Sequence, residues 1–201
     1  MDTYEQQTQQ KQQARRMGEL LGSAAERAVP VVSGLPDAAL TAPTPCAEYD
    51  VKALVNHLFQ VVVEFRKLAA KRDADFTTTP DRVGEEGDWR ERFAGAVEEL
   101  VAAWSAPGAE EGTSGAMNMP ARLVGAMVLL DLTVHAWDLA RATGQPYEAP
   151  PQVVGVLAEA VAELAPTARS MGVFGEPVPA RAGASPFDRL LAATGRHPHQ
   201  W

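Results

Sequence analysis

Three ionisable side chains lie close together in one predicted helix, in the stretch LLDLTVHAWDLARATG at residues 129–144. The four-residue spacing puts Asp131 and His135 one turn apart on an otherwise apolar stripe, and Asp138 lies near the edge of that stripe. An ionised carboxylate in such surroundings needs a hydrogen-bond donor, a countercharge or a cation, because burying it alone is costly. The helix therefore carries either a structural polar network or a binding site.

Two interpretations account for Asp131 and His135. In the first, the carboxylate accepts a hydrogen bond from the imidazole or from an arginine on another helix, as most buried polar groups do. In the second, both side chains bind one metal ion, since a carboxylate and an imidazole one turn apart can share a cation. The spacing alone leaves both interpretations open, and the second needs a third ligand from elsewhere.

His57 is the histidine best placed to be that third ligand. It lies within a predicted second helix, whereas His197 and His199 belong to a C-terminal tail and are assigned no role. A carboxylate and two imidazoles would leave coordination positions open for water or substrate, as in catalytic rather than closed structural zinc sites.

Three further residues near these positions have both a functional and a structural interpretation. Asp138 could accept a hydrogen bond from the imidazole of His135 and orient it, or pair with Arg141 on the surface. Arg141 could bind a substrate carboxylate, although an exposed ion pair is the commoner role. Cys46 precedes the second helix, where a thiolate could be stabilised, but a small thiol that packs a turn is more typical.

The pattern of apolar residues predicts an all-α fold. Apolar residues recur at helical spacing in six segments, at 15–32, from 51 past 68, and at 88–104, 120–144, 151–171 and 186–193. No strand alternation, internal repeat or phosphate-binding glycine loop is evident. We expect a disordered glutamine-rich segment at 1–14, a metal-binding helical bundle at 15–172, and an irregular tail with one short helix at 173–201.

Composition narrows the class of protein. The 201-residue chain has a net charge of −8 and no cluster of Lys or Arg, which argues against nucleic-acid binding. Cys46 is the one cysteine, so no internal disulfide can form, as is usual in a reducing cytoplasm. With no signal segment and no long apolar run, we expect a cytoplasmic protein that does not span a membrane. An apolar helix face would allow a homodimer.

Two motifs resemble a known family. TPCAEYDVKALVNHL at 44–58, followed by DLTVHAWDLARATG at 131–144, resembles the DinB-like four-helix-bundle superfamily. Within it, the motifs are most similar to the actinobacterial branch that contains the metal-binding domain of mycothiol-dependent maleylpyruvate isomerase. The ending SPFDRLLAATGRHPHQW is similar to that of an uncharacterised subfamily of this branch, and the resemblance covers about residues 15–201.

The resemblance implies a metal- and thiol-dependent enzyme. It assigns His57, Asp131 and His135 as ligands of a divalent metal, usually zinc, and mycothiol as the cosubstrate. The implied reaction is attack of the activated thiol on a small electrophile, giving thiol transfer or isomerisation. The alternatives are a metal-binding or structural bundle without turnover, and a metal-free bundle that binds a small ligand.

The chain departs from the isomerase in three places. Asp131 stands where the isomerase commonly has Glu, and Tyr49 where the family usually has Trp. Only about 30 residues follow the predicted fifth helix, whereas the isomerase has a further C-terminal domain that contributes to substrate handling. We therefore do not expect maleylpyruvate itself to be the substrate.

Overall fold

The computed structural model describes residues 16–116 and 118–201, and the regular secondary structure of this part of the chain is mostly helical. The expected disorder at 1–14 lies outside the described residues. The elements are α2 (Met17–Ser33), the 3-10 helix η1 (Asp37–Ala39), α3 (Val51–Ala69), α4 (Trp89–Ser105), β1 (Thr113–Ser114), β2 (Met119–Pro120), α5 (Ala121–Thr143), α6 (Pro151–Ser170) and α7 (Pro186–Ala193). The predicted all-α, DinB-like bundle is confirmed.

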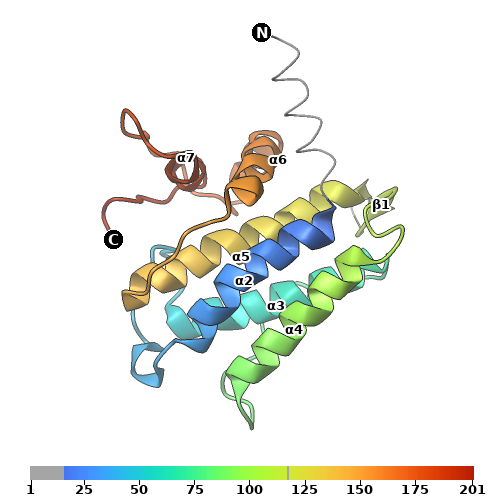
Figure 1. Ribbon diagram of the computed structural model, residues 1–201, viewed down its shortest axis with the longest axis horizontal. Coiled ribbons are helices and arrows are strands. Elements are labelled where there is room, and N and C mark those ends of the chain that lie inside the picture. Colours follow the sequence, from blue (N-terminus) through green and yellow to red (C-terminus); the bar gives the residue numbers. More distant parts are fainter. Residues whose placement is uncertain (1–15, 117) are drawn as a thin grey trace.

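Helices α2, α3, α4 and α5 form the bundle (Figure 1). Helix α5 contacts α2, α3 and α6, and α4 closes the far side by packing on α2 and α3. By length and composition α5 could cross a membrane, but 83% of its most apolar 18-residue stretch is buried within the protein. Its apolar residues thus belong to the bundle core.

Local sequence signals set several helix ends where they were expected. The Asp50 side chain accepts a hydrogen bond from the Ala53 N–H at 2.8 Å and caps α3. Gly144 ends α5 with a left-handed φ of 68°, and Pro151 opens α6. Both α2 and α6 continue through an internal proline, Pro30 and Pro166 respectively.

One expectation about secondary structure was wrong. Strands β1 and β2 pair as a short antiparallel ladder, Thr113 with Pro120 and Ser114 with Met119. Two-residue strands are too short to produce an alternating pattern, so periodicity could not reveal them. Pro120, expected within the first turn of the helix, instead precedes α5 as its N-cap residue.

Helices α6 and α7 lie outside the four-helix bundle, on the side of α5 (Figure 1). Helix α6 packs on α5, and α7 packs on α6. The hydroxyl of Ser185 accepts from the Asp188 N–H and the Asp188 carboxylate accepts from the Ser185 N–H, a capping box that starts α7. The C-terminal tail therefore contains one capped helix, which packs on α6.

Candidate metal centre

The packing of α3 against α5 brings three of the predicted site residues together. One ligand atom each from His57, Asp131 and His135 lies within 4.8 Å of the other two. His57 lies in the second turn of α3, and the other two side chains lie one turn apart on α5. The cluster spans two helices that are distant in sequence and adjacent in the bundle.

The spacing within the cluster fits a metal ion better than a hydrogen bond. Asp131 Oδ1 and His135 Nε2 are 3.7 Å apart, beyond hydrogen-bonding distance. Ligands about 2.1 Å from a tetrahedral ion are separated by about 3.4 Å. The side chain of Asp131 is 30% exposed and that of His135 is 9% exposed, so the cluster is open to solvent at the carboxylate. Two imidazoles and a carboxylate are a donor set that suits zinc.

Burial keeps His57 in the form that binds metal. Burial lowers the pKa of His57; His135 and Arg196 lower it further, whereas Asp131 raises it. The imidazole is therefore neutral near pH 7, and a neutral imidazole nitrogen is the ligand form.

Aromatic contacts hold the two imidazoles in place. The ring of Tyr49 stacks on His57 with centroids 5.2 Å apart, and His57 meets His135 edge-on at 5.1 Å. The buried Thr44 hydroxyl lies 2.8 Å from the Tyr49 carbonyl oxygen and 3.0 Å from that of Cys46. Thr44 therefore fixes the turn that carries Tyr49 over the cluster.

A second layer of polar contacts lies behind His135. Its Nδ1 is 2.9 Å from Oδ2 of Asp138, a carboxylate with no exposed surface. This contact favours the tautomer that carries the proton on Nδ1 and leaves Nε2 free to face Asp131. The same Oδ2 accepts a hydrogen bond from Nη2 of Arg196 at 3.0 Å.

The two arginines near this layer are placed differently. Arg141 is exposed, and its guanidinium lies 5.8 Å from the centroid of the Trp137 ring. Arg196, which sequence reasoning missed, follows α7 in the tail and reaches the buried carboxylate of Asp138. Helical spacing could not have revealed it, because Arg196 lies on no helix and far from α5 in sequence.

Cys46 belongs to a second group of possible ligands. One atom each from Cys46, His135 and Asp138 also lies within 4.8 Å of the others. Burial raises the pKa of Cys46 to about 11, against a smaller lowering by Arg196. The thiol is therefore protonated at neutral pH, and the guanidinium beside Asp138 already supplies the positive charge there. This group is a poorer cation site than His57, Asp131 and His135.

An apolar cavity of about 410 Å³ lies farther along the same two helices. Phe65 of α3 and Met127 of α5 line it together with Met119 and Phe76. Met127 lies one helical turn before Asp131 on α5, and Phe65 lies about two turns after His57 on α3. Among the described residues that line it, Asp73 is the one acidic side chain and none is a lysine or arginine.

Comparisons with known proteins identify the family of the chain. Residues 21–140 match the model of the mycothiol maleylpyruvate isomerase N-terminal domain, a span that contains all three clustered residues. The chain is 32% identical over 164 residues, 78% of its own length and 85% of the relative's, to uncharacterized proteins Rv0738 and MT0763 from two strains of Mycobacterium tuberculosis. No solved structure matches the chain. The chain belongs to the family defined by the mycothiol maleylpyruvate isomerase N-terminal domain.

Proposed function

We propose that this protein binds one divalent metal ion, zinc, through His57, Asp131 and His135. We further propose that it uses the ion with a low-molecular-weight thiol, mycothiol, to transfer that thiol to a small electrophile or to isomerise the electrophile. The proposal rests on one observation: three possible ligand atoms from two helices lie within 4.8 Å of one another. Family membership supports it, because the matched domain is named for mycothiol and an isomerase.

The side chains of this site have separable tasks in the proposed reaction. His57 and His135 supply nitrogen donors, and Asp131 supplies a carboxylate at the solvent-exposed side. A divalent ion held there would lower the pKa of a thiol or water bound to it. Tyr49 covers the cluster on the side of the His57 ring, and the Asp131 side stays open to solvent.

The residues that line the apolar cavity indicate which electrophiles it could bind. Without a lysine or arginine in its lining, it offers no countercharge to a dicarboxylate, and its phenylalanine and methionine side chains suit an uncharged apolar group. The proposed substrate is therefore a small electrophile other than maleylpyruvate. The proposed location of the reaction is the cytoplasm.

The deciding experiment compares wild-type protein with His135→Ala and His199→Ala. Each is purified without chelators, its metal content is measured by elemental analysis, and mycothiol is titrated into it by calorimetry. His199 is exposed in the tail, away from the cluster, so it controls for losing a histidine. We expect one metal ion per chain in the wild type and in His199→Ala, and none in His135→Ala, with mycothiol binding that depends on the metal.

Other results would redirect the assignment. Metal without mycothiol binding would contradict the thiol-dependent enzyme and identify a structural ion or a different ligand. Absence of metal from the wild type after reconstitution with zinc would overturn the site itself.

A further inference from the structure

The tail residue Arg196 is connected to the metal centre through Asp138. Its Nη2 donates to Asp138 Oδ2 at 3.0 Å, and the same oxygen lies 2.9 Å from Nδ1 of His135. Arg196 is 9% exposed and Asp138 is 0% exposed. A continuous polar chain therefore runs from the C-terminal tail to the imidazole whose other nitrogen faces Asp131.

The turn after α7 is built to direct Arg196 inward. Gly195 has a φ of +88°, a backbone conformation that favours glycine. A Cβ on Gly195 would lie 2.9 Å from the Cα of Gly175, so the two backbone segments touch there. The Arg196 N–H then donates to the Leu191 carbonyl at 2.9 Å, which fixes the start of the side chain.

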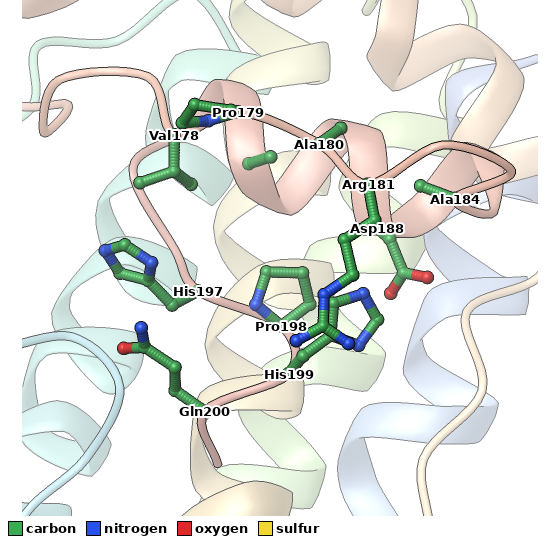
Figure 2. Close-up of a pocket in the computed structure, with 11 residues that line it drawn as sticks. Val178, Pro179, Ala180, Arg181, Ala184, Asp188, His197, Pro198, His199 and Gln200 are labelled. Atoms are coloured by element: carbon green, nitrogen blue, oxygen red, sulfur yellow. The ribbon is translucent and has the colours of Figure 1, made fainter.

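The rest of the tail supports this turn. The Val178 N–H donates to the Ala192 carbonyl at 3.0 Å, which ties the segment before α7 to the end of that helix. Figure 2 shows the small pocket that results, with Val178, His197 and Gln200 at the left of the view and Arg181 and His199 at the right. Arg196 immediately precedes this folded segment, so its position depends on the fold of the whole tail.

The buried carboxylate of Asp138 also needs a positive charge beside it, which Arg196 supplies. Asp138 is enclosed by the bundle, and within the described residues its Oδ1 has no hydrogen-bond partner. Burial lowers the pKa of Arg196, but the carboxylate of Asp138 outweighs burial through its charge and its hydrogen bond, with smaller contributions from Cys46 and Asp131, so the pKa is raised. The guanidinium therefore stays charged and compensates the carboxylate.

We propose that Arg196 is a positioning residue of the metal centre, which holds Asp138 so that His135 keeps its Nδ1–H tautomer and presents Nε2 to the metal. The inference rests on the metal site proposed above. It goes beyond the family, because the tail lies outside the matched residues 21–140. In this protein the C-terminal tail completes a site whose ligands all lie within the bundle.

The test distinguishes an Arg196 that positions His135 from an Arg196 that only attaches the tail to the rest of the protein. Arg196→Met removes the contact with Asp138. Arg169→Met is the matched control, because Arg169 donates to the Ala193 carbonyl at 2.7 Å and ties α6 to the end of α7 without reaching the site. Arg196→Lys keeps the charge but loses the forked donor geometry. Zinc affinity is measured by calorimetry, and the His135 tautomer is read from ring nitrogen shifts by NMR in metal-free protein.

We expect zinc affinity to fall about 10- to 100-fold in Arg196→Met, as for loss of other groups that orient a ligand. Arg169→Met should retain wild-type affinity, and Arg196→Lys should fall between the two. In metal-free protein, wild-type His135 should show one tautomer, protonated at Nδ1, and Arg196→Met should show both.

Two results would overturn the inference. One is wild-type zinc affinity and a single His135 tautomer in Arg196→Met. The other is an equal loss of affinity in Arg196→Met and Arg169→Met, which would assign Arg196 a purely structural role. Because the tautomer is read without metal, it tests Arg196 even if wild-type protein binds no zinc, a result that would refute the proposed function instead.

Discussion

The two aspartates of α5 differ in role because their surroundings differ. Asp131 is 30% exposed and lies 3.7 Å from His135, so it is free to bind a cation. Asp138 is fully buried and already contacts His135 and Arg196. His135 lies between them and uses one ring nitrogen toward each. Environment, more than residue type, therefore separates the proposed ligand Asp131 from Asp138, the group proposed to orient His135.

Cys46 provides a prediction at the scale of a single residue. Because its pKa is raised from 9.0 to about 11, its thiolate fraction at pH 8 should be about 100-fold below that of an ordinary thiol. Iodoacetamide should thus alkylate the folded protein at least about 100-fold more slowly than the same chain in urea. Equal rates in the two states would contradict the burial of the thiol.

The same shift predicts a pH dependence of stability. Folding raises the pKa of an acid here, so the folded state binds a proton that the unfolded state has released between pH 9 and about 11. Stability contributed by the neutral thiol should therefore be lost as the pH rises through this window. Urea unfolding of wild type and Cys46→Ser at pH 8 and pH 10 checks the sign.

At the scale of elements, the site depends on how closely the helices of the bundle approach α5. Gly125 lies where α5 meets α2 and α4, and a Cβ there would be 2.7 Å from Met17 Cγ and 3.0 Å from Trp104 Cζ3. Both neighbours are fully or almost fully buried, so they have little room to move. A glycine at this position lets α5 lie deep enough in the bundle to face α3 with its polar stripe.

Two glycine-to-alanine substitutions should therefore have opposite effects. Gly125→Ala should destabilise the protein by about 1–3 kcal/mol, because the methyl group overpacks a filled interface. Gly95→Ala, on the exposed side of α4 with nothing within 4 Å of the added Cβ, should stabilise by about 0.5–1 kcal/mol through helix propensity. Urea denaturation measures both, and the same sign for the two would refute the packing argument.

At the scale of the whole molecule, the three residues of the proposed metal centre meet only in the folded state. They come from α3 and α5, which the chain separates by α4 and two loops. In the unfolded chain the entropy of closing that loop opposes their meeting, so an ion that binds all three would bind the native state preferentially. The proposed site therefore predicts that metal binding and folding are coupled.

Zinc should stabilise the wild-type protein accordingly. At free zinc 100 times the dissociation constant, the free energy of unfolding should rise by about 2.7 kcal/mol, and a chelator should reverse the gain. Thermal unfolding with and without zinc measures the effect, with His135→Ala as the control in which the increment should vanish. An increment that persists in His135→Ala would place the zinc elsewhere.

The sequence by itself determined the helices and the faces they present. Helical periodicity placed Asp131 and His135 on one stripe of α5 and His57 inside α3, because side chains four residues apart always share a face. Asp50, Gly144 and Pro151 marked helix ends through local backbone chemistry that needs no tertiary context. These signals act over a few residues and can be read directly.

The tertiary structure alone decided what meets across the helices. The approach of His57 to Asp131 and His135, its edge-on contact with the His135 ring and the position of Cys46 beside Asp138 all depend on how α3 and the turn before it pack on α5. Arg196 reaches Asp138 only because α7 packs on α6 and the chain turns at Gly195. No local pattern relates residues so distant in sequence, since their contact is created by packing rather than by backbone periodicity.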